Sequence, residues 1–159
     1  MIKYIENGDI FALDDVYSFA HGCNCAGAMG KGIALQFREK FPEMFTQYKD
    51  LCLSGDFGLG DVYLYQYEKG YVFNLGTQKT WKTKAEIIAI EQSLNRMFEI
   101  ATLKEIKKIA IPKIGAGLGG LDWNLVKNMI NDVAQNYDQI DLYIVENYVP
   151  YLKTKQSLS

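Results

Sequence analysis

The sequence predicts an α/β domain of three layers, in which helices cover both faces of one sheet. Short segments rich in Val, Ile, Tyr and Phe alternate along the chain with longer segments whose apolar residues recur every three or four positions. Strands that alternate with helices in this way are typical of such a sheet. Each of two glycine-rich segments also follows a predicted strand and precedes a predicted helix. The length of 159 residues indicates one domain.

Six segments are predicted to be strands because they are short, rich in β-branched and aromatic residues, and bounded by turn residues. The turn Asn7-Gly8-Asp9 follows the first of them, and Glu68-Lys69-Gly70 separates the third from the fourth. The predicted strands are 2–6, 16–23, 61–67, 71–75, 107–112 and 140–146.

The predicted helices follow from apolar residues that share one helical face. Ile33, Phe37 and Phe41 recur at intervals of four. Pro42 either kinks this helix or begins a second one that runs to residue 50. The longest helix is predicted over 84–103, and the last over 122–137.

A capping box is expected at the start of the longest helix. The segment Thr83-Lys84-Ala85-Glu86 has the pattern in which the Thr hydroxyl and the Glu carboxylate satisfy free backbone amides reciprocally. This pattern makes Lys84 the first helical residue.

Charge and composition exclude several classes of protein. The chain has 17 Lys and Arg against 19 Asp and Glu, a net charge of −2, which argues against bulk electrostatic capture of nucleic acid. No apolar run approaches the roughly 18 residues of a membrane span, and residues 1–6 lack a signal-peptide pattern. We expect a cytoplasmic protein without a membrane contact, with Cys23, Cys25 and Cys52 as reduced thiols.

His21 is the only histidine, and this fact argues against metal chemistry. A zinc site would have to combine His21 with Cys23, Cys25 and Cys52, and one residue between two cysteines is not the usual ligand spacing. We therefore expect no metal site and no cofactor.

Two glycine-rich loops, 27–32 and 115–120, carry the expected binding chemistry. Glycine lets the backbone approach a ligand closely, and the helix that follows adds a partial positive charge. One such loop is as readily a simple tight turn, but two in equivalent places suit a pyrophosphate. The first loop is not a Walker A motif, because Cys25 and Gly32 replace required residues. The second has the dinucleotide fingerprint, but only one strand follows it.

Taken together, these segments resemble the macrodomain family, whose members bind ADP-ribose. The resemblance covers nearly the whole chain and depends on residues 7–10, 21–34 and 112–123. It implies a six-stranded mixed sheet in a single macrodomain over residues 1–152, with a loose tail at 153–159. The chain looks most similar to the branch that removes ADP-ribose from proteins or from thymidine in DNA. Residues 21–25 also resemble a yeast ADP-ribose phosphate phosphatase.

The resemblance implies a set of ligand contacts. Asp9 would accept a hydrogen bond from the adenine amino group, or alternatively bind nearby backbone in a turn. Asn24 would lie near the distal ribose, and Asn147 or Tyr148 would flank the adenine. The other implied ligand-binding residues are Ile10, Gly27, Met29, Gly30, Lys31, Gly32, Ile33, Gly115, Ala116, Gly117, Leu118, Gly119 and Gly120.

The resemblance makes Lys84 the candidate catalytic residue, because it matches the lysine that attacks the distal ribose and forms a covalent intermediate. At a helix start the dipole disfavours a cation by about 0.3 to 1 kcal/mol, which would ease loss of the proton. The alternative is an ordinary exposed lysine.

The acid partner departs from the family pattern. Gly119 stands where the protein glycohydrolase has an aspartate, and the nearest carboxylate, Asp122, also fits a helix N-cap. His21 would serve as acid or base in a phosphatase, or else be a strand histidine satisfied by backbone. Trp81 and Trp123 would either cover the ligand or belong to the core.

Three functions therefore remain open: a hydrolase that releases ADP-ribose from a macromolecule, a non-catalytic ADP-ribose reader, and a phosphatase that acts on an ADP-ribose phosphate. The expected partners are ADP-ribose and ADP-ribosylated protein or DNA, and no toxin partner can be named. Lys79, Lys82 and Lys84 form a small basic cluster that suits phosphates or simply faces solvent.

Overall fold

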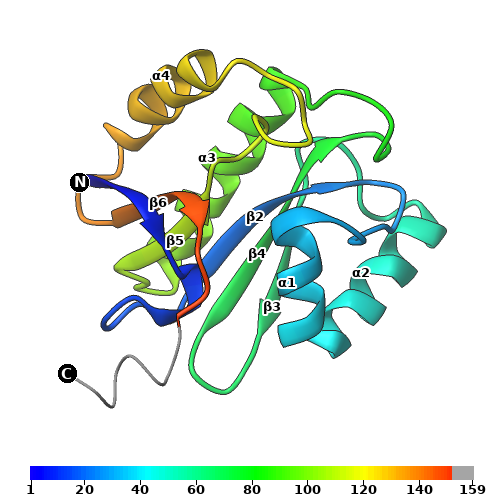
Figure 1. The fold of residues 1–159 in the computed structure, drawn as a ribbon, viewed down its shortest axis with the longest axis horizontal. Coiled ribbons are helices and arrows are strands. Elements are labelled where there is room, and N and C mark those ends of the chain that lie inside the picture. The colour runs from blue at the N-terminus through cyan, green and yellow to red at the C-terminus, as the bar shows by residue number, and fades with distance from the viewer. Residues whose placement is uncertain (152–159) are drawn as a thin grey trace.

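A six-stranded mixed sheet runs through the middle of the molecule, with helices on both of its faces (Figure 1). This computed structural model describes residues 1–151, so the predicted tail at 153–159 lies outside the described residues. The strand order is β1-β6-β5-β2-β4-β3, and only β3 is antiparallel to its neighbour. The three-layer α/β/α prediction is confirmed. The strands are β1 Ile2–Gly8, β2 Phe19–Asn24, β3 Val62–Gln66, β4 Tyr71–Gln78, β5 Lys108–Pro112 and β6 Asp141–Tyr148.

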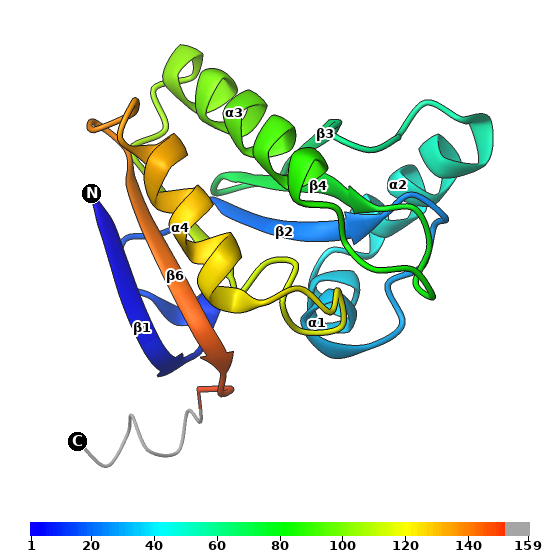
Figure 2. The same cartoon turned by 90° about the horizontal axis from the view of Figure 1, so that it is seen from above.

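Two separate cores lie on the two faces of the sheet. Helices α3 and α4 pack on one face, while a short 3-10 helix, α1 and α2 pack on the other (Figure 2). Side chains of the inner strands alternate between the cores, as the period of two in a strand requires. The helices are η1 Ile10–Ala12, α1 Gly32–Lys40, α2 Pro42–Ser54, α3 Ile87–Leu103 and α4 Trp123–Ala134.

Strand β5 illustrates this alternation. Ile109 and Ile111 are fully buried against α3 and α4, and Ala110, between them, is buried in the opposite core. Full burial of an aliphatic side chain of this size contributes about 1.5 to 3 kcal/mol. Both faces of the inner strands are therefore held by apolar contacts, and the strand ends are left to form a site.

Pro42 begins a new helix and does not kink the first one. Phe41 ends α1 and precedes α2, and Pro42 occupies the first turn of α2. A proline suits this position because its missing N–H would have no partner in the first turn anyway. Helix α2 ends at Gly55, whose φ of +78° favours glycine.

The longest helix begins later than the sequence predicts, and the expected capping box is not formed. Helix α3 starts at Ile87, and Glu86 precedes it without a side-chain cap. The Thr83 hydroxyl instead donates to the Thr80 carbonyl at 3.1 Å and accepts from the Thr80 amide at 3.1 Å. A local turn thus takes the hydroxyl that the capping box needs, and Lys84 lies before the helix.

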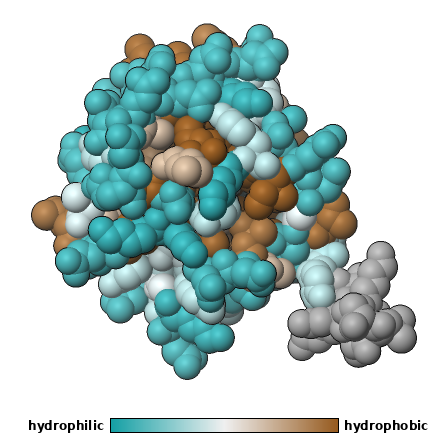
Figure 3. All heavy atoms as spheres, turned by 90° about the vertical axis from the view of Figure 1, so that its left-hand side faces the viewer, coloured by the Kyte–Doolittle hydropathy of each residue, from teal (hydrophilic) through white to brown (hydrophobic). Residues whose placement is uncertain are grey.

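The two edges of the sheet differ in what surrounds them. β1 forms one edge, and the side of the molecule that carries β1 and the N-terminus is mostly hydrophilic, with apolar side chains in a smaller central area (Figure 3). β3 forms the other edge, beside α2 and α3. Within the part of the chain that is described, no helix has the length and apolarity needed to cross a bilayer.

The strands that will matter for the site are β2, β4 and β5. β2 pairs with β4 along its whole length, from Phe19 to Asn24. Its pairing with β5 is limited to Phe19 opposite Ala110. The two parallel strands therefore separate toward their carboxyl ends, and this separation opens the sheet edge. In parallel sheets this is the edge at which ligands bind.

Candidate functional site

A cleft of about 820 Å³ opens where β2 and β5 separate. Residues 28–34 of the first glycine loop and α1 form one wall, and residues 112–115 and 117–119 form the opposite wall. Thr77, Gln78, Trp81 and Lys82, from the segment between β4 and α3, line it as well. The two glycine-rich loops predicted to bind a ligand thus lie on opposite sides of one cleft.

The charge of this cleft is one-sided. Lys31, Lys82 and Lys113 line it, and within residues 1–151 no Asp or Glu is among its lining residues. The chain as a whole has a net charge of −2, so the positive charge is a local property of the cleft. Such a cavity attracts an anionic ligand.

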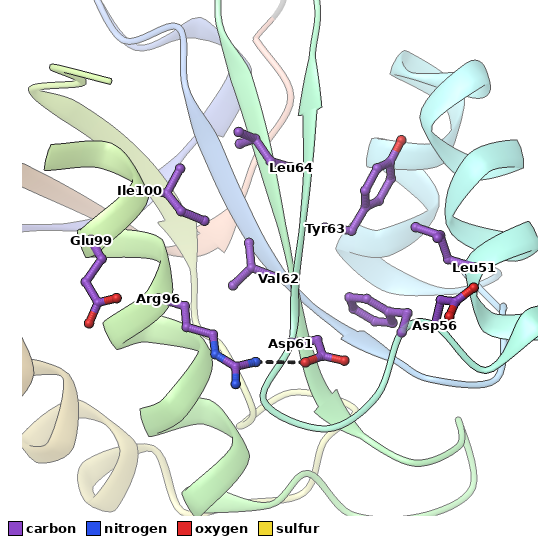
Figure 4. Close-up of a pocket in the computed structure, with 10 residues that line it drawn as sticks. Leu51, Asp56, Asp61, Val62, Tyr63, Leu64, Arg96, Glu99 and Ile100 are labelled. Atoms are coloured by element: carbon purple, nitrogen blue, oxygen red, sulfur yellow. Dashed lines mark hydrogen bonds and ion pairs between the residues drawn. The ribbon is translucent and has the colours of Figure 1, made fainter. Parts of the chain in front are cut away.

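A second, smaller hollow has the opposite character. It measures about 460 Å³ and lies at the β3 edge between α2 and α3 (Figure 4). Three carboxylates, those of Asp56, Asp61 and Glu99, line it together with Arg96, which pairs with Asp61 at 2.7 Å. Its predominantly negative lining makes it unsuitable for an anion, so we assign the site to the basic cleft.

The first glycine loop delivers free backbone amides to the cleft. Gly32 has a φ of +60° and begins α1, and Lys31 precedes it without a side-chain cap. The first amides of a helix have no partner within the helix, so here they are available to an anion. Gly30, Lys31, Gly32 and Ile33 all line the cleft.

Asn24 holds this loop in place and also lines the cleft. Its Nδ2 donates to the Ala28 carbonyl at 2.8 Å, and its Oδ1 accepts from the Ala26 and Ala28 amides at 3.0 and 3.2 Å. The buried Tyr48 hydroxyl donates to the Asn24 carbonyl at 2.6 Å and lies 3.0 Å from Oδ1. The amide that was expected near the distal ribose is therefore engaged by the loop itself.

The second glycine loop is a closed turn that reaches the first. The Leu121 amide donates to the Gly115 carbonyl at 2.9 Å, and Gly115 and Gly120 both have positive φ. Leu118, which is 70% exposed, extends from this loop across the cleft. A β-carbon at Gly32 would lie 3.5 Å from Leu118 Cδ1, so the two loops meet here.

Lys84 lies beside the second loop, in an extended segment ahead of α3. The next two amides fix this segment, because Ala85 donates to the Gly119 carbonyl at 2.9 Å and Glu86 to the Thr77 carbonyl at 2.8 Å. The Lys84 side chain runs along Gly120, with Cγ 3.5 Å from where a β-carbon would be. Because Lys84 is not part of α3, the expected effect of the helix dipole on its amine does not apply.

Asp122 is an N-cap and does not line the cleft. Its Oδ1 accepts from the Asn124 amide at 3.0 Å at the start of α4. This is the alternative that the sequence left open for Asp122, and it places the predicted acid outside the cleft. Trp123, the first residue of α4, packs against the core and donates its indole N–H to Glu146 at 2.8 Å, whereas Trp81 lines the cleft.

His21 is fully buried and has no access to the cleft. Its ring stacks on Phe37 with centroids 4.0 Å apart, and Nε2 lies 2.6 Å from Asn74 Oδ1. Burial lowers the pKa of His21 to about 4, although the Asn74 hydrogen bond opposes this effect. The predicted acid or base role for His21 is therefore wrong for this structure, because a neutral, enclosed imidazole cannot reach a substrate. Its partner is a side chain and not the backbone.

The residues expected around an adenine lie beyond the cleft lining, at the carboxyl ends of β1 and β6. Asp9 Oδ1 accepts from the Phe11 amide at 2.9 Å, and Oδ2 accepts from the Tyr151 amide at 2.8 Å. Asn147 Nδ2 donates to the Glu6 carbonyl at 2.9 Å, and Ile10 is fully buried. Each oxygen of a carboxylate has two lone pairs, so Asp9 retains acceptor capacity for a ligand.

The predicted ligand-binding residues thus divide into two groups. Ten of them line the cleft: Asn24, Met29, Gly30, Lys31, Gly32, Ile33, Gly115, Gly117, Leu118 and Gly119. Six do not: Asp9, Ile10, Gly27, Ala116, Gly120 and Asn147. The sequence did not predict that Lys113 and Gln78 line the cleft, although each lies at or next to the carboxyl end of a strand.

The cysteines offer neither a nucleophile nor a metal site. All three are free thiols, and burial, with smaller contributions from nearby acidic groups, raises the pKa of Cys25 to about 11. Its thiol is therefore protonated at neutral pH. Among the described residues, no group of three or more His, Cys, Asp or Glu side chains is arranged to hold a metal ion.

Comparison with known proteins identifies the class to which this fold and cleft belong. The Macro domain family matches residues 20–130, and the chain belongs to this family. A DNA ADP-ribosyl glycohydrolase from Mycobacterium tuberculosis is 32% identical over 148 residues, which cover 91% of this chain and 42% of that protein. The chain thus spans less than half the length of this relative.

Two solved structures are also similar. The macrodomain of Mycobacterium tuberculosis DarG has a TM-score of 0.83 and 32% identity, with coverage of 95% of this chain and 99% of that one. Thermosipho africanus DarTG, solved in complex with ADP-ribose, has a TM-score of 0.75 and 28% identity, with coverage of 86% and 39%.

Removing the Tyr48 hydroxyl should loosen the first glycine loop. We expect Tyr48→Phe to lower the free energy of unfolding by about 1 to 3 kcal/mol, because the buried Asn24 carbonyl loses its donor. ADP-ribose affinity should fall as well. Urea unfolding and calorimetry test this, with Tyr65→Phe as control, since the Tyr65 hydroxyl has no hydrogen-bond partner among residues 1–151. If Tyr48→Phe and Tyr65→Phe lowered stability and ADP-ribose affinity equally, the Tyr48 hydroxyl would not be what holds the first glycine loop.

His21 should make the protein less stable in mild acid. Its pKa is about 4 in the folded protein, whereas an exposed histidine has a pKa of 6.5. Between pH 4 and pH 6.5 the His21 imidazole is mostly protonated in the unfolded chain and mostly neutral in the folded protein. The free energy of unfolding should fall by about 3 kcal/mol as the pH drops from 7 to 4. His21→Gln should lose this part of the pH dependence. Parallel pH profiles of the two proteins would contradict the burial of a neutral imidazole.

Proposed function

We propose that this chain is a hydrolase that releases ADP-ribose from a modified macromolecule. The observation that carries this proposal is the cleft itself, in which two amide-rich loops and three lysines surround a space without a carboxylate. A pyrophosphate needs such donors on both sides. The similarity to a relative named DNA ADP-ribosyl glycohydrolase supports the reaction class, and favours modified DNA over protein as the substrate.

The strand order supports one orientation of the ligand. Asp9 follows β1 at one side of the sheet, and the segment with Lys84 follows β4 on the other side. With the adenine at Asp9 and the pyrophosphate between the two loops, the distal ribose lies next to Lys84. The bond to be broken then lies at the end of the cleft that faces the macromolecule.

In this orientation Lys84 acts as a nucleophile. After losing its proton to solvent, the ε-amine attacks C1″ of the distal ribose, the bond from C1″ to the macromolecule breaks, and the leaving atom takes up a proton. Water then hydrolyses the bond between C1″ and the amine, which releases ADP-ribose and restores Lys84. Solvent supplies the proton, because none of the described residues places a carboxylate in the cleft lining.

A non-catalytic ADP-ribose reader is the second candidate. It is favoured by the absence of an acid among the described cleft residues, since Asp122 caps α4 and Gly119 has no side chain. The phosphatase is disfavoured because the histidine on which it would depend is buried. Turnover separates the two remaining candidates.

The three free thiols support a reducing compartment, and we propose the cytoplasm. A relative from Thermosipho africanus is named a fusion of a DNA ADP-ribosyl transferase with a DNA ADP-ribosyl glycohydrolase. This name supports a DNA ADP-ribosyl transferase as the enzyme that produces the substrate.

ADP-ribose should bind much more tightly than AMP. AMP has one phosphate and reaches one loop, whereas the pyrophosphate of ADP-ribose engages both. Calorimetry at two salt concentrations measures this, and Lys113→Ala should weaken binding of ADP-ribose more than binding of AMP. Equal affinities for the two ligands would show that the loops do not act together.

Lys84 should be required for turnover and not for binding. Lys84→Ala and Lys84→Arg should both abolish release of ADP-ribose, because neither side chain supplies a nucleophilic amine. ADP-ribose affinity should stay within about tenfold. A ring-opened ribose forms a Schiff base with the amine, so borohydride added during turnover should trap a covalent adduct in the parent protein alone.

The control for this experiment is Lys107→Ala, an exposed lysine just before β5, at the opposite end of the strand from the cleft. It should retain full activity on ADP-ribosylated DNA and protein. Full activity of Lys84→Ala would overturn the lysine mechanism. Absence of turnover by the parent protein on both substrates would establish the reader.

A further inference from the structure

We propose that the exposed ring of Trp81 is a second binding site, at which an unpaired base of the modified nucleic-acid strand stacks. This inference rests on the proposed function, because it assigns the part of the substrate outside ADP-ribose. The site would take the nucleotide next to the one that carries the ADP-ribose.

The exposure of Trp81 calls for an explanation. Its side chain is 59% exposed at the cleft, although tryptophan is one of the residues that gain most from burial. The Lys82 ammonium lies 4.9 Å from the ring centroid. Trp123, by contrast, packs against the core and has a hydrogen-bond partner for its indole N–H. An exposed apolar surface next to a ligand cleft is typical of a binding surface.

The loop that presents this ring is held by its own hydrogen bonds. Gln78 Nε2 donates to the carbonyls of Thr80 and Thr83 at 2.9 and 3.1 Å. The Thr80 hydroxyl accepts from the Lys82 amide at 3.2 Å. The turn is further closed by the Thr83 hydroxyl, and its far end is joined to the second glycine loop. The ring is thus presented on an ordered turn, as a stacking surface requires.

The charge around Trp81 favours a nucleic acid over an acidic peptide. Residues 77–85 contain Lys79, Lys82 and Lys84 and no Asp or Glu. Lysines flanking an aromatic ring are the combination by which proteins hold single strands, since the ring stacks on the base and the ammonium groups meet the phosphates. An acidic peptide would pair with the lysines, but it has no base to stack on the Trp81 ring.

The position of Trp81 agrees with this role. It lies on the segment between β4 and α3, three residues before Lys84, at the side of the cleft opposite Asp9. In the proposed orientation the distal ribose faces this segment. The macromolecule attached to that ribose therefore leaves the cleft beside Trp81, where a neighbouring base can reach the ring.

The experiment compares binding of a short single-stranded DNA that carries one ADP-ribose with binding of free ADP-ribose. Lys84→Ala is the background, so that the substrate stays intact. Adding Trp81→Ala should weaken binding of the modified DNA at least tenfold more than it weakens binding of free ADP-ribose. Trp81→Phe should retain most of the affinity. The control is Leu53→Ala, which removes another exposed apolar side chain, from α2.

Fluorescence gives a readout of stacking. The chain has two tryptophans, so the DNA should quench indole emission in the Lys84→Ala protein, and Trp81→Phe should abolish that quenching. An ADP-ribosylated peptide of similar charge should lose no more affinity without Trp81 than free ADP-ribose does.

The possible outcomes are distinct. Unchanged affinity for modified DNA in the Trp81→Ala protein would overturn the inference. An equal loss for DNA and free ADP-ribose would also overturn it, because Trp81 would then belong to the ADP-ribose site, and an equal loss for DNA and peptide would assign a protein substrate. Absence of turnover with Trp81-dependent DNA binding would refute the hydrolase and leave the stacking site standing.

Discussion

The divergence of β2 from β5 is the constraint on which the rest of the structure depends. β2 follows β4 through its full length but meets β5 only at Phe19 and Ala110. The parallel strands all end at the same edge of the sheet. There the chain leaves β2 and β5 on opposite sides of the gap between them. Both glycine loops begin at this gap, so the cleft follows directly from the strand pairing.

A rigid support beneath the first loop converts that gap into an anion site. Tyr48, on α2, reaches the end of β2 and binds Asn24, and Asn24 in turn holds Ala26 and Ala28. With these bonds made within the protein, the amides at the start of α1 are the donors left free. Binding an anion then requires little rearrangement, which keeps the entropic cost of binding small.

The cleft is positively charged because lysines line it and, among the described residues, carboxylates do not. In the described part of the chain, three carboxylates line the second hollow, at the β3 edge, and none lines the cleft. Asp122, the nearest candidate, is used to cap α4. An anionic ligand thus meets lysines as the charged side chains of the cleft, and Trp81 lies beside one of them, Lys82, in its lining.

The sequence by itself determined the fold class, the alternating elements and the two glycine loops, because hydrophobic periodicity and glycine depend on local geometry. Tertiary structure decided which side chains face the cleft. Asn24 became a support and His21 a core residue because Tyr48 and Asn74, which are distant in sequence, supply their partners. Lys84 lies before α3 because the carbonyls of Gly119 and Thr77 accept hydrogen bonds from the amides of the two residues that follow it. Such long-range hydrogen bonds have no periodic signal, so only the folded chain reveals them.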